Sequence, residues 1–150
     1  PALYATLEDG QRLDLPGHAL FAVFDGHGGS YAALYAGRNL CRVLAKQSTF
    51  GQYAQNYTDT TSSSASNTDS QLVQLLETAM THAFLDLDQE IACALKGQKV
   101  ADADAPYHGP APPPAPAPTE QADAALQQML DEEGDSGTTA CVILLTPDYI

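Results

Sequence analysis

The chain has 150 residues, of which 6 are Lys or Arg and 19 are Asp or Glu, so the formal net charge at pH 7 is −13. That charge argues against nucleic-acid binding, because an acidic surface repels phosphate backbones, whereas it tolerates metal cations and basic partners. With 44% hydrophobic residues, the chain can form the core of one domain, and its length leaves hardly any room for a second.

The N-terminal region predicts two strands separated by an acidic turn. Apolar and polar residues alternate over Leu3–Leu7, which is the period of a half-buried strand, and the Glu-Asp-Gly turn at 8–10 ends it. Ala19–Phe24 is an unbroken apolar run, and it predicts a strand buried on both faces. This second strand leads into Asp25–Gly29, whose sequence is DGHGG.

Two helices are expected after this loop. The first runs from Ser30, a candidate N-cap, to about Gln47, and the second runs from about Leu72 to Gly97. Apolar residues recur at helical spacing in both; they are Ala33, Ala36, Gly37, Leu40, Val43 and Leu44 in the first helix, and Leu72, Leu76, Ala79, Ala83, Leu87, Ile91 and Ala94 in the second. We expect the basic residues of the first helix to face solvent, namely Arg38, Arg42 and Lys46.

Polar and proline-rich segments separate these elements. Residues 51–70 are rich in Ser, Thr and Asn and predict a flexible loop, and residues 101–120 predict a solvated proline-rich insertion. A short helix is expected over 122–130, a second continuous apolar strand over Thr138–Leu145, and a returning strand from Tyr149. A partner strand that has only begun indicates that residues 1–150 are part of a domain. The alternative is a complete acidic metal-binding or nucleotide-binding module.

The strongest chemical signal is the strand, loop and helix around Asp25. A carboxylate at a strand end, glycines that let a ligand approach the backbone, and a following helix N-terminus suit a metal or a phosphate. The loop lacks the spacing of a Walker or dinucleotide site. If the two strands are neighbours, Glu8 and Asp9 converge with Asp25 into an oxygen ligand set of the kind that Mg²⁺ prefers. Either acidic segment alone could instead be a plain turn.

The three cysteines, Cys41, Cys93 and Cys141, are far apart and lack CxxC spacing. Neither a disulfide framework nor a structural zinc site is indicated. We expect three buried thiols in a reducing compartment, and therefore a cytoplasmic protein. No apolar run is long enough to span a membrane.

Three segments together resemble the metal-dependent serine/threonine protein phosphatases of the PP2C (PPM) family. Phe21–Gly29 (FAVFDGHGG) is similar to the family's signature loop, Ser136–Ala140 (SGTTA) to its Ser-Gly-x-Thr-Ala strand, and Glu8 with Asp9 to its Met-Glu-Asp. The resemblance implies an α+β fold, a PP2C-like sandwich of two antiparallel β-sheets flanked by helix pairs (αββα), here as a partial domain.

The resemblance also implies an activity and a set of site residues. The reaction is hydrolysis of phosphoserine and phosphothreonine in proteins by a water that two Mg²⁺ or Mn²⁺ ions activate. Asp25 would bridge the two ions, Glu8 and the Gly26 carbonyl would hold the metal–water shell, and Asp9 would support it. His27 would be the general acid. The implied partners are phosphorylated proteins, bound by a monomeric catalytic domain.

Two departures from the family pattern stand against a simple assignment. The family has a phosphate-clamping arginine four residues before the glutamate, where this chain has Tyr4; Arg12 could reach the phosphate instead. The family's later metal aspartates would follow Ile150, so the 150 residues alone are expected to be inactive. The alternative function is a catalytically inactive PP2C-like pseudophosphatase that acts as a binding scaffold.

Overall fold

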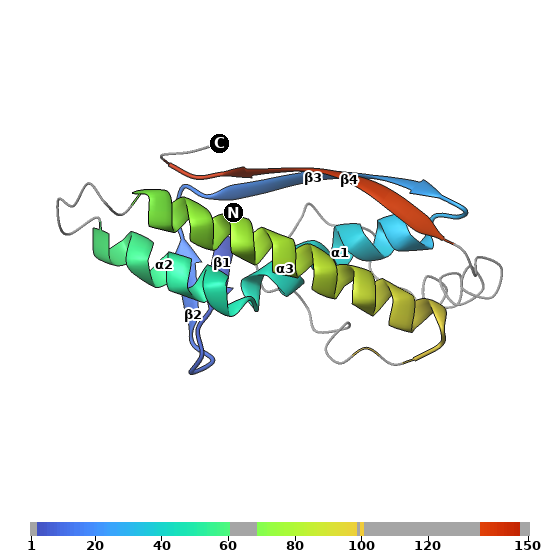
Figure 1. Ribbon diagram of the computed structural model, residues 1–150, viewed down its shortest axis with the longest axis horizontal. Helices are drawn as coiled ribbons and strands as arrows, with labels where there is room; N and C mark the ends of the chain where they lie inside the picture. The colour runs from blue at the N-terminus through green and yellow to red at the C-terminus, as the bar shows by residue number, and fades with distance from the viewer. Residues whose placement is uncertain (1–2, 61–68, 99, 101–135, 148–150) are drawn as a thin grey trace.

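The computed structural model describes residues 3–60, 69–98, 100 and 136–147. Within these residues the elements follow in the order β1, β2, β3, α1, α2, α3 and β4. The long ribbon of β3 and β4 lies along one side of the helices, and the small β1–β2 hairpin contacts α1 and α2 (Figure 1). The described part is therefore α+β with two separate antiparallel sheets, as the sequence predicts.

The N-terminal segment forms a hairpin. β1 (Leu3–Thr6) pairs antiparallel with β2 (Arg12–Leu15), and the first strand is confirmed. The turn between them is closed by main-chain hydrogen bonds, one of them from the Leu7 N–H to the Gln11 carbonyl at 2.8 Å. The second strand was not predicted, because it is only four residues long and its polar residues are mostly exposed.

The second sheet is the ribbon of β3 (Ala19–His27) and β4 (Gly137–Leu145), paired antiparallel along their whole length. One face packs on the core through the partly buried side chains of Leu20, Phe24, Val142 and Leu144. The other face is open, with Phe21 60%, Val23 69% and Ile143 47% exposed. The expectation that the strand of Ala19–Phe24 is buried on both faces is therefore wrong for the described chain. Side chains alternate along a strand, and the helices cover one face only (Figure 1).

Both predicted helices are confirmed. α1 spans Tyr31–Ala45 and α3 spans Asp69–Leu95, and they pack against each other along their apolar stripes. The prediction that Arg42 faces solvent is wrong. Its side chain is only 6% exposed and forms an ion pair with Glu90 of α3. An arginine can lie in a helix interface when a carboxylate on the facing helix compensates its charge.

The predicted loop over 51–70 is wrong at both of its ends, since α2 spans Ser48–Thr60 and α3 already begins at Asp69. Phe50, Tyr53 and Ala54 are buried, and Tyr57 packs against the same core. Their spacing of three and four residues is that of a helix face, which the many polar residues around them concealed. The aromatic rings stack, with Phe50–Tyr53 and Tyr53–Tyr57 centroids 6.0 and 5.8 Å apart.

The loop between β2 and β3 carries a buried histidine. His18 is 2% exposed, and its Nε2 lies 2.6 Å from the Tyr53 hydroxyl of α2. Its Nδ1 lies 3.2 Å from the Pro16 carbonyl, and its ring meets Tyr57 edge to face. Because the carbonyl can only accept, Nδ1 donates to it, and in the neutral imidazole Nε2 then accepts from the tyrosine. His18 therefore connects the hairpin to α2.

Several expectations fall outside the described residues: the proline-rich insertion over 101–120, the short helix over 122–130 and the returning strand from Tyr149. Across the described ranges, no helix combines the length and the hydropathy that a membrane crossing requires. All three cysteines are free; Cys41 and Cys93 are partly buried and Cys141 is exposed. The expectation of buried thiols is thus wrong for Cys141, which lies on the open side of β4.

Candidate active site at the end of the ribbon

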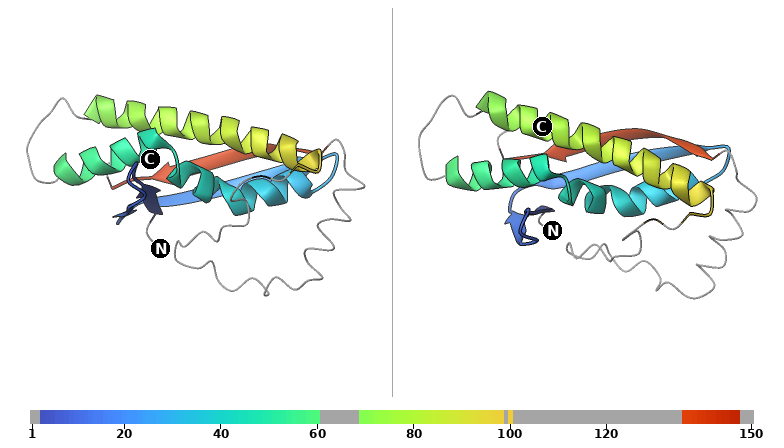
Figure 2. Two further views of the ribbon diagram at one scale, coloured as in Figure 1. Left: turned by 90° about the horizontal axis from the view of Figure 1, so that it is seen from below. Right: turned by 60° about the horizontal axis from the view of Figure 1, so that its bottom comes forward.

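The register of β3 and β4 brings the two glycine-containing motifs together. Asp25 pairs with Thr139, Gly26 with Thr138, and His27 with Gly137 at the last position of the ladder. More than 100 residues separate these segments in the sequence, yet they form one corner at the end of the ribbon where β3 turns into α1 (Figure 2). We call Asp25–Gly29 together with Ser136–Thr139 the ribbon corner.

The loop of the ribbon corner depends on glycine. Gly28 has a φ of 64° and Gly29 a φ of 125°, a region that residues with a Cβ rarely adopt. Gly26 is required for a different reason, since a Cβ there would lie 3.0 Å from the Gly29 carbonyl oxygen and 3.2 Å from the Ala33 Cβ. The chain can therefore reverse from β3 into α1 within three residues.

The N-terminus of α1 is capped from a distant part of the chain. Ser30 occupies the predicted N-cap position but makes no capping hydrogen bond with its side chain. Instead, the Ala32 N–H donates to the Ser136 Oγ at 3.1 Å. The first N–H groups of a helix have no partner within the helix, so this bond satisfies one of them.

The three predicted site residues on β3 are exposed at this corner. The Asp25 main-chain oxygen lies 3.5 Å from the Thr139 Oγ1, which donates to it. The His27 imidazole lies over Gly137, so close that a Cβ on Gly137 would be 2.5 Å from the His27 Nε2. The structure thus places Asp25, Gly26 and His27 side by side at this corner. Contrary to the expectation, Asp25 does not lie at the end of a buried strand, because this part of β3 is exposed.

The structure does not bring Glu8 and Asp9 to this corner. They lie in the turn of the β1–β2 hairpin, where the Asp9 Oδ1 accepts from the Gln11 N–H at 2.9 Å. There they line a hollow of about 230 Å³ with residues of α2. Since β1 pairs with β2 and not with β3, the condition for convergence is not met. Figures 1 and 2 place the hairpin at one end of the molecule and the β3–α1 loop at the other.

Tyr4 and Arg12 also lie in the hairpin. The Arg12 guanidinium carbon is 4.0 Å from the centre of the Tyr4 ring, a cation–π contact, and its Nε donates to the Asp14 Oδ1 at 2.7 Å. Arg12 therefore binds partners within its own hairpin, and in this arrangement it does not reach the ribbon corner. That Arg12 could replace the phosphate clamp stays a prediction.

The donor atoms of the ribbon corner are of the type that a hard metal ion prefers, but they are fewer than such an ion requires. The Asp25 carboxylate and the Gly26 carbonyl offer oxygen atoms, the ligands that Mg²⁺ and Mn²⁺ prefer. Among the residues that the structure describes, no three His, Cys, Asp or Glu side chains gather as a metal-binding group. The described part of the chain thus offers oxygen donors at this corner but no complete metal-binding group.

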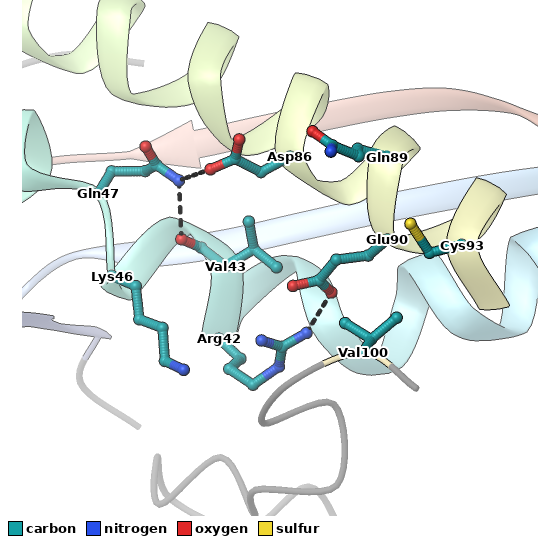
Figure 3. A pocket seen from close by; sticks show the side chains of 9 residues that line it. All are labelled: Arg42, Val43, Lys46, Gln47, Asp86, Gln89, Glu90, Cys93 and Val100. Carbon is teal, nitrogen blue, oxygen red and sulfur yellow. Dashed lines mark hydrogen bonds and ion pairs between the residues drawn. The ribbon is translucent and has the colours of Figure 1, made fainter. Parts of the chain in front are cut away.

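A larger hollow of about 370 Å³ lies between α1 and α3 (Figure 3). The sequence did not indicate it, because its lining residues come from α1, α3 and the residues that follow each of them, and no local pattern predicts how these segments pack. Glu90 accepts from Arg42 and, at 3.0 Å, from the Tyr35 hydroxyl. Burial, and then the hydrogen bond and charge of Glu90, raise the pKa of Tyr35. In the lining of the same hollow, Gln47 donates to Asp86 at 2.8 Å.

The comparisons with known proteins agree with the motifs. The family model described as protein phosphatase 2C matches residues 5–94, more than half of the chain. The chain therefore belongs to the protein phosphatase 2C family, and the expected α+β fold class is confirmed for the described part.

Similar relatives carry the same family name. A stretch of 43 residues is 49% identical to "Protein phosphatase 2C homolog 2" of Hypocrea jecorina (strain QM6a), covering 27% of this chain and 10% of the relative. A stretch of 74 residues is 38% identical to "Probable protein phosphatase 2C 47" of Oryza sativa subsp. japonica, covering 49% and 16%. The chain therefore matches only a small part of these relatives' length. No solved structure matches it significantly.

Proposed function

We propose that this chain forms part of a phosphatase that hydrolyses phosphoserine and phosphothreonine in proteins with the help of Mg²⁺ or Mn²⁺. The observation that carries the proposal is the pairing of β3 with β4, which puts His27 and Asp25 beside the Ser136–Ala140 motif at one exposed corner. Family membership supports a protein phosphatase, and an exposed corner suits a substrate as large as a protein.

Asp25 and Gly26 would hold the metal. Asp25 is on a paired strand, so its backbone is rigid, and its side chain is open to solvent. When bound, a pair of such ions supplies an activated water and neutralises the charge of the phosphoryl oxygens. Glu8 and Asp9 remain candidates on the order of the motifs alone, because their present place is the hairpin turn.

His27 would supply the proton that the leaving group needs. In the hydrolysis, a bond forms between the water oxygen and phosphorus while the bond from phosphorus to the serine or threonine oxygen breaks. An alkoxide is a poor leaving group, so a proton transferred from the imidazolium to that oxygen lowers the barrier. His27 is exposed and adjacent to Asp25 and Gly26, so it can contact the same phosphate.

The test is carried out on the full-length protein that contains this chain, with a phosphothreonine peptide and Mn²⁺. Asp25→Asn should lower kcat by roughly a hundredfold or more, the scale on which charge-stabilising groups act. Asp88→Asn makes the same chemical change at an exposed position of α3 and should leave turnover unchanged. Full activity in excess EDTA would contradict the metal-dependent mechanism.

One observation favours the alternative, an inactive scaffold: Tyr4 stands where the family has its phosphate-clamping arginine, and Arg12 is engaged beside it. The same assay decides between the two. If the full-length protein binds phosphopeptides but hydrolyses none of them with Mn²⁺ present, the scaffold function replaces the phosphatase.

A further inference from the structure

The first two residues of the Ser136–Ala140 motif contact the two elements that the loop after His27 joins: Gly137 lies against His27 at the end of β3, and Ser136 bonds to Ala32 in the first turn of α1. We propose that Ser136 and Gly137 are positioning residues, which hold the His27 imidazole in place for proton transfer; this inference rests on the proposed function. Neither residue would touch the substrate.

Gly137 contacts the imidazole directly. His27 and Gly137 are the last pair of the β3–β4 ladder, and the ring occupies the space above the glycine. A Cβ built on Gly137 would be 2.5 Å from the ring's Nε2, 2.9 Å from Cε1 and 3.3 Å from Cδ2. Any side chain there must displace the ring, whereas the strand pairing itself can persist. Gly137 thus provides a flat surface on which the imidazole lies.

Ser136 holds the other end of the loop. It is 8% exposed, and its Oγ accepts from the Ala32 N–H in the first turn of α1. Ser30 makes no capping bond with its side chain. The hydroxyl of Ser136 therefore caps the N-terminus of α1 in its place. The cap ties α1 to the beginning of β4, one residue before the surface on which His27 lies.

The sequence between these two contacts explains why the loop needs them. Gly28 and Gly29 connect His27 to Ser30, and glycine has the greatest conformational freedom of any residue. A loop of this kind does not determine the direction of the preceding side chain by itself. Contacts from Ser136 and from Gly137, the first residue of β4, hold the elements on both sides of the loop, so the imidazole stays near one orientation.

The main experiment uses Gly137→Ala in the full-length protein with Mn²⁺. Two substrates are compared: a phosphothreonine peptide, whose leaving oxygen must be protonated, and p-nitrophenyl phosphate, whose leaving group departs without a proton. We expect kcat for the peptide to fall by roughly tenfold or more, part of the range that general acids contribute, with little change in KM. Turnover of p-nitrophenyl phosphate should change less than threefold.

Gly37→Ala is the matched control, because a Cβ on Gly37 in α1 meets only the Phe24 ring, at an ordinary 3.8 Å. It should leave both turnover rates unchanged. Ser136→Ala removes the acceptor of the Ala32 N–H without adding atoms. It should lower peptide turnover more than p-nitrophenyl phosphate turnover, and by less than Gly137→Ala does.

A double-mutant cycle separates positioning from general damage. If Gly137 acts through His27, adding Gly137→Ala to His27→Ala should have no further effect on peptide turnover. If the two losses multiply instead, or if Gly137→Ala slows both substrates equally, Gly137 has a structural role and the inference is wrong.

A measurement without turnover keeps this inference distinct from the proposed function. The imidazole C–H signals of His27, assigned by their loss in His27→Ala, should move in Gly137→Ala and stay in place in Gly37→Ala. If the parent protein hydrolyses neither substrate, the proposed function fails and the positioning role for catalysis fails with it. Unmoved His27 signals in Gly137→Ala would overturn the positioning role even in an active enzyme.

Discussion

The buried ion pair between α1 and α3 offers a sharp test of what holds the helices together. The paired side chains of Arg42 and Glu90 are 6% and 19% exposed (Figure 3). Glu90 also accepts from the Tyr35 hydroxyl. Glu90→Gln keeps the size of the side chain and an acceptor for the tyrosine, but it removes the negative charge. Arg42 is then left as a buried cation that donates from its Nε to the neutral Asn39 Oδ1 at 3.1 Å.

Breaking a buried pair by removing one charge costs about 3 to 5 kcal/mol. Because Glu90 keeps some exposure to water, we expect the lower end, a loss of about 3 kcal/mol in the free energy of unfolding. With roughly 2 kcal/mol per molar urea, this lowers the unfolding midpoint by about 1.5 M. Replacing both partners with neutral side chains, as in Arg42→Met with Glu90→Gln, should recover most of the loss, since no uncompensated charge remains.

Urea unfolding of the full-length protein, followed by circular dichroism, measures these midpoints. Asp14→Asn is the control, because the Arg12–Asp14 pair is 38% and 63% exposed and should contribute less than about 1 kcal/mol. A Glu90→Gln midpoint within error of the parent would refute the reasoning. So would a double variant that is as unstable as the sum of the single variants.

Three further outcomes follow from the described residues. Burial and a hydrogen bond to a carboxylate raise the pKa of Tyr35 from its ordinary 10.0, so the unfolded chain loses this proton first. The contribution of Tyr35 to the free energy of unfolding should therefore be fully present below about pH 10 and decrease above it. In urea titrations at several pH values, Tyr35→Phe should make this decrease smaller. Burial also raises the pKa of the Cys41 thiol. In the 150-residue chain, iodoacetamide should therefore label the exposed Cys141 faster than Cys41, which mass spectrometry would detect. Val23→Thr should reduce light scattering by that chain, because Val23 is 69% exposed on the open face of the ribbon; unchanged scattering would contradict this.

The elements with one strong period could be predicted from the sequence. The stripe of α3 from Leu72 to Leu87 recurs every three or four residues, and each of its five core positions is buried. The family resemblance was also available, because Asp25–Gly29 and Ser136–Ala140 are contiguous motifs that need no knowledge of packing. The composition of α2 led to the wrong prediction of a loop, because its polar residues outnumber the four positions that face the core.

What the sequence by itself determined is therefore local: the long helices, the long strands, the glycine turn after His27 and the family. The tertiary structure alone decided which distant residues meet, because pairing and packing depend on contacts between segments that no local period encodes. It placed Arg42 against Glu90 instead of in solvent. It also paired β1 with β2, which keeps Glu8 and Asp9 away from Asp25. Finally, it put Ser136 and Gly137 on either side of the His27 loop, through a strand register that spans more than 100 residues.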